Sequence, residues 1–141
     1  MSKKPHICFL SGLEIPKGRY SREHISPRSK VPMYIASHPY NIAPAIKIIN
    51  VIKADRFLCE WQDQKYELCY HAVQKWNLKQ VDKDIIMQAL EKFKTEEPMN
   101  PCEHCVLSKI GTEYCYAQKK LEKYRAKWLY PLQFGKGPTQ R

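Results

Sequence analysis

Short apolar runs separated by polar turns fill the first quarter of the chain. Residues 7–10 (Ile-Cys-Phe-Leu) predict a short strand that ends at a Ser-Gly turn. After a second polar turn, residues 20–27 predict the partner strand of a hairpin. Pro27 is expected to end that strand, because a proline cannot donate a hydrogen bond to a sheet. Residues 28–39 have no clear period and are interrupted by prolines, so they predict an ordered loop.

A helical period replaces this pattern after residue 40. Asn41 precedes a predicted helix that begins near Pro44, where a proline is favourable because a first-turn N–H has no partner in a helix. Four residues then recur at helical spacing and are expected on one face of that helix: Ile46, Ile49, Asn50 and Lys53.

Three more helices are expected after residue 56. Residues 57–77 predict the first, with a possible break at Asp63, and Val81 opens the second. The second helix has a buried stripe at Ile85, Ile86, Ala89, Leu90 and Phe93. A lysine-rich helix is expected from about Glu113 to Trp128.

Together these patterns predict an α+β chain in three parts. Residues 1–56 hold the strands and the first helix, and residues 57–134 form a mainly helical extension with a cysteine cluster. Residues 135–141 are expected to form a flexible tail. A length of 141 residues suits one domain, or a compact motif with an extension.

The charge adds an expectation about partners. Twenty-four Lys and Arg against 14 Asp and Glu leave a formal charge of +10, which favours a polyanion as partner but also suits a ribosomal or membrane-surface protein. The chain contains no apolar run near the ~20 residues of a membrane span, and no signal peptide is recognisable. We therefore expect a cytoplasmic or other reducing intracellular compartment, where cysteines are metal ligands or core residues.

Residues 23–53 contain the groups that hydrolyse a phosphodiester with one metal ion. The reaction needs a neutral imidazole as base, and a hard divalent ion held by oxygen donors. His24 supplies the first, and Glu23 and Asn50 supply oxygens. Lys53 follows one helical turn beyond, suited to hold a phosphate, and Asn41 is placed to brace the histidine loop. Adjacent residues of a strand point to opposite sides, so Glu23 and His24 need a local bend to act together.

Three segments in this order resemble the HNH motif of the ββα-metal nucleases: Glu-His-Ile-Ser-Pro at residues 23–27, Asn41, and Asn-Val-Ile-Lys at residues 50–53. The resemblance covers about residues 7–56. It implies that Glu23 and Asn50 bind Mg²⁺ or Mn²⁺, that His24 is the general base, and that Asn41 orients it.

Two departures from that family stand out. Many members bracket the motif with Cys-x-x-Cys pairs that bind zinc, but here Ser11 stands where the partner of Cys8 would be. The acidic residue is Glu23, where Asp is commoner in the family. Simpler explanations remain for the motif residues: His24 as a loop histidine, Asn41 as a helix cap, and Lys53 as a solvated charge.

The expected function is that of a metal-dependent DNA endonuclease or nickase, acting alone or in a larger nucleoprotein complex. The alternative is an inactive HNH-like nucleic-acid-binding or structural protein in a ribonucleoprotein or viral assembly. The expected partner is double-stranded DNA. Seven basic residues are assigned to contact it: Arg22, Arg28, Lys47, Arg56, Lys119, Lys120 and Lys123.

A second group of residues is typical of structural zinc. Cys102 and Cys105 form a Cys-x-x-Cys knuckle, and Cys115 follows. We expect these three to bind zinc far from His24 and to hold the C-terminal helices together. The fourth ligand stays open among His104, His71, Cys59, Cys69 and Cys8. Two alternatives are that these cysteines are unligated, and that the chain is a zinc-stabilised interaction module.

Overall fold

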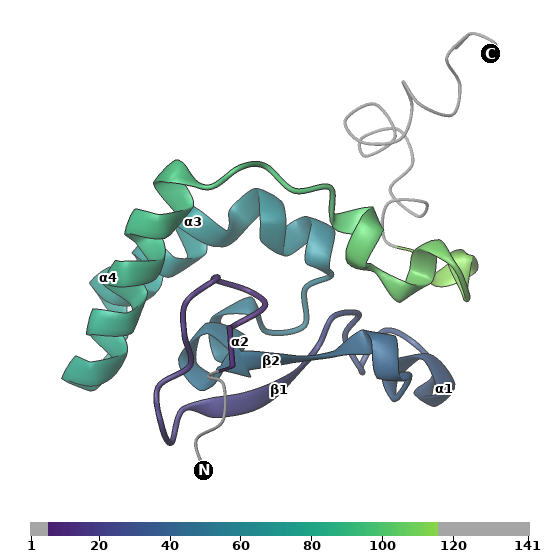
Figure 1. Cartoon of the computed structure of the whole chain (residues 1–141), viewed down its shortest axis with the longest axis horizontal. Coiled ribbons are helices and arrows are strands. Elements are labelled where there is room, and N and C mark those ends of the chain that lie inside the picture. The colour runs from purple at the N-terminus through teal and green to yellow at the C-terminus, as the bar shows by residue number, and fades with distance from the viewer. Residues whose placement is uncertain (1–5, 116–141) are drawn as a thin grey trace, which may run out of the picture.

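The computed structural model describes residues 6–115. Strands β1 (Tyr20–His24) and β2 (Ile42–Ile46) form an antiparallel sheet, with Glu23 opposite Ala43 in the register. Helix α2 (Lys47–Lys53) follows β2 directly and contacts both strands (Figure 1). The expectation of an α+β fold is confirmed. The expected tail, and the expected lysine-rich helix from residue 116 onward, lie outside the described residues.

The connection from β1 to β2 is more structured than predicted. It contains a short helix, α1 (Met33–Ala36), and a 3-10 helix at Pro39–Asn41. The prediction of an ordered loop over residues 28–39 therefore missed the short helix within it. Pro32 starts α1, because a proline is tolerated where a helix begins, and Ser37 ends it with its hydroxyl donating to Met33 O at 2.8 Å.

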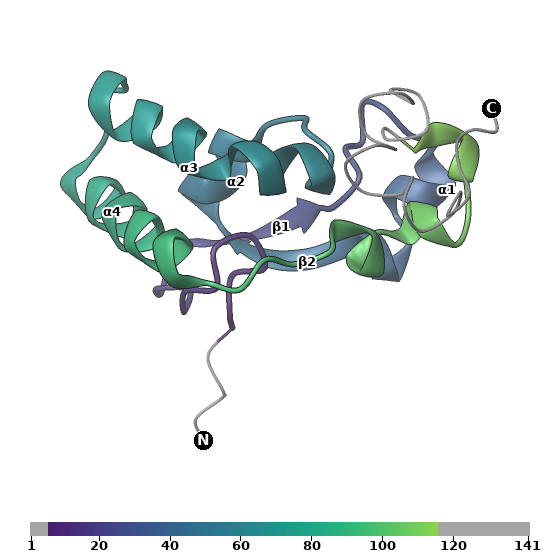
Figure 2. The same cartoon turned by 90° about the horizontal axis from the view of Figure 1, so that it is seen from above.

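Two long helices form an antiparallel pair over α2 (Figures 1 and 2). They are α3 (Leu58–Lys75) and α4 (Gln80–Thr95). The Glu60 carboxylate accepts a hydrogen bond from Phe57 N at 2.8 Å and caps the start of α3. The predicted break at Asp63 is wrong, because α3 runs through it. The predicted stripe of α4 is buried at Ile85, Ile86, Ala89 and Leu90, with Phe93 partly buried.

The main hydrophobic core joins the N-terminal segment, α2, α3 and α4. Trp61 is fully buried in it, and its Nε1 donates to Leu10 O at 3.2 Å. Core residues come from both sides of residue 56, so the motif region and the helical extension pack together. Among residues 6–115, no helix is both long enough and apolar enough to cross a membrane.

A second, smaller core lies where the C-terminal segment passes α1 (Figure 2). This segment consists of three 3-10 helices, at Pro101–His104, Val106–Ser108 and Thr112–Tyr114. The buried members of this core are Val31, Ile35, Ala36, Phe57, Val106 and Leu107.

The predicted hairpin of residues 7–10 with residues 20–27 is wrong. Ile7 makes only an isolated bridge with Glu14, and the partner of β1 is β2. Residues 44–46, expected in a helix, lie in this strand, and α2 begins only at Lys47. Pro44 is compatible with the strand because its φ is also allowed there, and its carbonyl accepts from Phe9 N at 2.8 Å.

Candidate functional site

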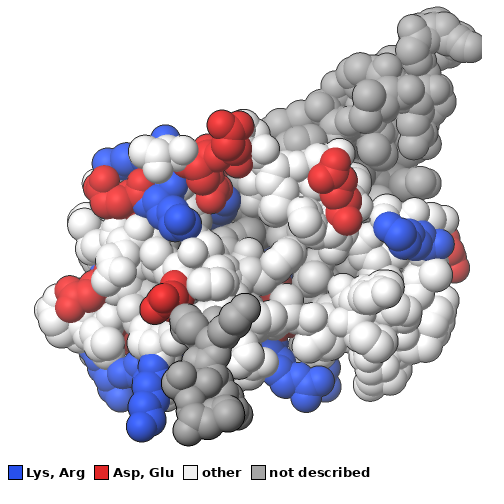
Figure 3. Space-filling view, viewed as in Figure 1, with Lys and Arg blue, Asp and Glu red and all other residues white. Residues whose placement is uncertain are grey.

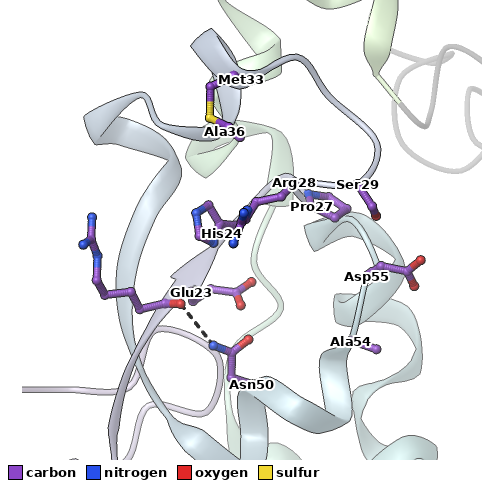
Figure 4. Close-up of a pocket in the computed structure, with 11 residues that line it drawn as sticks. Glu23, His24, Pro27, Arg28, Ser29, Met33, Ala36, Asn50, Ala54 and Asp55 are labelled. Carbon is purple, nitrogen blue, oxygen red and sulfur yellow. Dashed lines mark hydrogen bonds between the residues drawn. The ribbon is translucent and has the colours of Figure 1, made fainter.

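A cavity of about 540 Å³ opens where β1 ends. Glu23 and His24 from β1 and Asn50 from α2 project into it (Figure 4). Adjacent residues of a strand were expected to point to opposite sides. Glu23 and His24, the last two residues of β1, nevertheless both line this cavity. The remaining lining residues are Arg22, Pro27, Arg28, Ser29, Met33, Ala36, Ala54 and Asp55.

The side chain of Asn50 is held by β1. Its Nδ2 donates to Ser21 Oγ at 3.1 Å and to the Arg22 carbonyl at 3.2 Å. Because the amide hydrogens are used on the strand, Oδ1 turns to the side of the Glu23 carboxylate, as Figure 4 shows. This oxygen accepts no hydrogen bond from residues 6–115. A carboxylate and a free amide oxygen thus face one space.

Glu23 is paired with Lys53, which does not line the cavity. Lys53 Nζ lies 2.6 Å from Glu23 Oε2, and the two side chains are 0% and 2% exposed. The same ammonium donates to the His24 carbonyl at 3.3 Å and the Ile25 carbonyl at 3.4 Å. Burial raises the pKa of Glu23 above its ordinary value, and the Lys53 charge opposes that rise. Glu23 Oε2 meets Lys53 as a charge, without a hydrogen bond of regular geometry from the described residues.

This placement corrects the role predicted for Lys53. Its ammonium is fully buried and lies outside the residues that line the cavity, so it does not reach a phosphate there. Nζ is surrounded by the Glu23 carboxylate, with which it forms an ion pair, and by the two carbonyl oxygens to which it donates. Lys53 instead positions Glu23 and the end of β1. A lysine at this spacing on a helix is usually solvated, and only the packing of α2 on β1 reveals the difference.

His24 is partly exposed to the cavity, and residues 6–115 make no hydrogen bond to its ring. Partial burial lowers the pKa of His24 below its ordinary value of 6.5, and the positive charges of Arg28 and Arg22 lower it further. The neutral imidazole, which is the form that accepts a proton, is therefore favoured at neutral pH.

Asn41 braces the loop that follows His24. It is fully buried; its Oδ1 accepts from Ser26 N at 2.7 Å, and its Nδ2 donates to Ser26 O at 3.0 Å and Ala36 O at 3.2 Å. The predicted position at a helix entrance is wrong, because Asn41 ends a 3-10 helix before β2. Contact with the histidine loop, which was the reason for choosing Asn41, is present in the structure.

The predicted nucleic-acid contacts fall into three groups. Arg22 and Arg28 are exposed and line the cavity, and Lys47 is exposed at the start of α2. Arg56 is half-buried, and its guanidinium donates to Lys53 O at 3.3 Å and Gln64 Oε1 at 3.2 Å. Lys119, Lys120 and Lys123 lie outside the described residues. In Figure 3, Lys and Arg lie along the lower edge of the face shown, and others lie among Asp and Glu in its upper part.

The sequence did not single out several residues that shape the site. Ser21 and Ser26 hold Asn50 and Asn41, and Asp55 adds a second carboxylate at the cavity. Ala54 has φ 56° and ψ −136°, a backbone conformation costing about 1–3 kcal/mol in a residue other than glycine. No local signal marks the serines, because their roles depend on the register between β1 and β2. Asp55 follows the motif helix and could have been proposed from that position.

The cysteines of the predicted zinc site lie together at the second core. Cys102, Cys105 and Cys115 line one small cavity, which Cys59 completes. As placed, no three His, Cys, Asp or Glu side chains of residues 6–115 form a group that could hold a metal ion. Cys105 Sγ lies 3.7 Å from Ser26 Oγ, only two residues beyond His24, so the expectation that this cluster is remote from His24 is wrong.

Comparisons of the chain with protein-family models, with curated proteins and with solved structures found no match.

Proposed function

We propose that this chain is a metal-dependent endonuclease or nickase of the HNH type, acting on double-stranded DNA. One observation carries the proposal: Glu23, His24 and Asn50, chosen from the order of residues alone, line a single open cavity. Two exposed arginines, Arg22 and Arg28, line the same cavity and supply positive charge where a phosphate backbone would lie.

The oxygen donors at this cavity fit a hard divalent ion. Among residues 6–115, Asn50 Oδ1 has no hydrogen-bond donor, because the Nδ2 of the same amide binds β1, and the Glu23 carboxylate lies on the same side. Carboxylate and amide oxygens with retained waters are the ligands that suit Mg²⁺. When bound, such an ion supplies charge stabilisation at the phosphate and the leaving oxygen. Glu23 and Asn50 are the residues that would hold Mg²⁺ or Mn²⁺.

His24 is the base in this proposal. Its neutral ring accepts the proton of the attacking water, and its lowered pKa keeps that form populated at neutral pH. Asn41 acts through position, because its hydrogen bonds to Ser26 hold the loop that begins after His24. Lys53 also acts through position, since it holds both the Glu23 carboxylate and the His24 carbonyl.

The Glu23–Lys53 pair favours a second candidate function. Lys53 already supplies a positive charge 2.6 Å from Glu23 Oε2, so the carboxylate is neutralised without a metal ion. A chain that keeps the scaffold for binding nucleic acid, and does not cut it, would also contain this pair. Under that alternative the arginines at the cavity bind the backbone and His24 has no chemical role.

Cutting of supercoiled plasmid separates the two candidates. The full chain is expected to convert it to the nicked form with Mg²⁺ or Mn²⁺ and to leave it intact with EDTA. Asn50→Ala should reduce the rate strongly, whereas Asn77→Ala, an exposed asparagine between α3 and α4, should not. Binding of the plasmid without cutting at any divalent-ion concentration would favour the inactive alternative.

A further inference from the structure

Four of the six cysteines surround one small cavity of about 20 Å³. They come from three separate segments. Cys59 lies in the first turn of α3, Cys102 lies in the 3-10 helix Pro101–His104 with Cys105 directly after it, and Cys115 follows the last 3-10 helix. A cavity of this size has room for about one water molecule or ion. None of the six cysteines forms a disulfide.

The cavity is built into the second core. Cys59, Cys105 and Cys115 pack against the buried cluster that includes Phe57 and Leu107. Gly111 makes the turn that returns the chain to Cys115; its φ is +64°, and a Cβ there would collide with Ile35 Cδ1. The gathering of thiols thus depends on a tight turn that packs against α1.

Burial disfavours the thiolate form of three of these cysteines. Burial, together with neighbouring Cys115 and Cys105, raises the pKa of the Cys59 thiol to about 12. Burial raises the pKa of Cys102 and Cys105 as well, and Cys115 adds to both shifts.

We propose that Cys59, Cys102, Cys105 and Cys115 form a structural Zn²⁺ site that joins the start of α3 to the C-terminal segment. Tetrahedral zinc takes four thiolates at about 2.3 Å. On binding, each thiol loses its proton to the solvent, so four Zn–S bonds form and four protons are released. The thiols surround the cavity without converging on one point, so they must turn inward to reach the ion. This site is independent of the proposed nuclease function.

The structure selects Cys59 as the fourth ligand from the candidates that the sequence left open. Cys8 and Cys69 are buried in the main core, and Cys8 Sγ accepts a hydrogen bond from Ile46 N at 3.3 Å. His71 lies on α3 about 18 Å beyond Cys59, given 1.5 Å per helical residue. His104 packs its ring edge-on to Phe9 and lines a different cavity.

A bound ion would also act on the loop behind His24. Cys105 Sγ lies 3.7 Å from Ser26 Oγ, and Asn41 holds Ser26 from the other side. Zinc at this position would therefore stabilise the second core, including the contact between the C-terminal segment and the histidine loop.

Metal binding by the full chain, purified under reducing conditions, tests this site. We expect bound zinc on purification. After its removal, titration with Co²⁺ should produce the absorption of a tetrahedral four-thiolate site. Cys59→Ser should weaken Co²⁺ binding by at least about tenfold, because even the loss of a residue that hydrogen-bonds to a metal ligand costs that much affinity. The absorption spectrum should also change to that of a site with three thiolates. The matched control, Cys69→Ser, should bind as the wild type does.

X-ray absorption on the zinc-loaded wild type keeps the test valid if Cys59→Ser does not fold. Four sulfur neighbours at about 2.3 Å would support the assignment, and three sulfurs with a nitrogen or oxygen would overturn it. A reduced wild type that binds neither Zn²⁺ nor Co²⁺ would overturn it as well, as would a folded Cys59→Ser that binds Co²⁺ as tightly as the wild type.

Discussion

Lys53 Nζ lies 2.6 Å from Glu23 Oε2, and neither side chain is more than 2% exposed. The pair joins the helix that carries Asn50 to the strand that carries His24. Breaking a buried ion pair from one side leaves a charge without water or partner, which costs far more than losing a surface pair. The relative placement of Glu23, His24 and Asn50 therefore depends on Lys53, although it does not line the cavity.

Lys53→Met is expected to lower the free energy of unfolding by about 3–5 kcal/mol, because it strands Glu23 as an unpaired buried carboxylate. Chemical denaturation followed by circular dichroism measures the change. The matched control is Lys94→Met, which removes an exposed pair with Glu91 and should cost less than about 1 kcal/mol.

The double variant Glu23→Gln with Lys53→Met should recover much of that loss, because no buried charge remains. If Lys53→Met and the double variant lose the same free energy of unfolding, the loss comes from repacking around the new side chain. That result would contradict the role given to the ion pair.

Asn41→Ala should destabilise the chain by about 1–3 kcal/mol or more, because Ser26 N–H and two carbonyls lose their buried partner. Plasmid nicking should fall as well, since the loop behind His24 loses its brace. Asn77→Ala, at an exposed position, should change stability by less than about 0.5 kcal/mol. An Asn41→Ala variant as stable as Asn77→Ala would contradict this role.

The rate of cutting should depend on pH through His24. Only the neutral ring accepts a proton, and burial with nearby Arg28 and Arg22 lowers its pKa below 6.5. Activity should therefore be constant above neutral pH and fall as the pH drops through a midpoint below 6.5. His71→Ala, which changes an exposed histidine on α3, should leave the profile unchanged. A midpoint well above 6.5 would argue against His24 as the base.

Binding to duplex DNA should weaken steeply as salt rises, because Lys and Arg side chains that bind phosphates release counterions. Arg22→Ala and Arg28→Ala should each reduce the slope of log affinity against log salt by about 0.9, the value for one phosphate that the protein no longer neutralises. Lys79→Ala, in the turn between α3 and α4, is the control and should leave the slope unchanged. Binding that is insensitive to salt would exclude this surface as the site that binds the DNA backbone.

Periodicity predicted the helical elements better than the strands. The buried face of α4 could be predicted because apolar residues such as Ile85 and Ala89 recur at helical spacing. The helix was predicted to begin near Pro44, but Pro44 lies in β2. A proline is compatible with a first helical turn and also with a strand position that donates no hydrogen bond, so its presence did not distinguish the two. The pairing of β1 with β2 joins distant segments, and local pattern did not reveal it.

The sequence predicted which residues line the candidate site, but it did not predict the contacts that hold them. The order of Glu23, His24 and Asn50 selected residues that meet at one cavity. The burial of Lys53 and the position of Cys59 depend on how α2 and α3 pack, and residue spacing alone does not determine packing.

Nicking of supercoiled plasmid by His24→Ala, with Mg²⁺ or Mn²⁺ present, tests the central claim most directly. Loss of the proton acceptor should lower the rate by about 10²–10⁴-fold while folding and DNA binding remain nearly unchanged. His71→Ala, at an exposed position on α3, should cut as the wild type does. A folded His24→Ala variant that nicks plasmid at the wild-type rate would contradict the account.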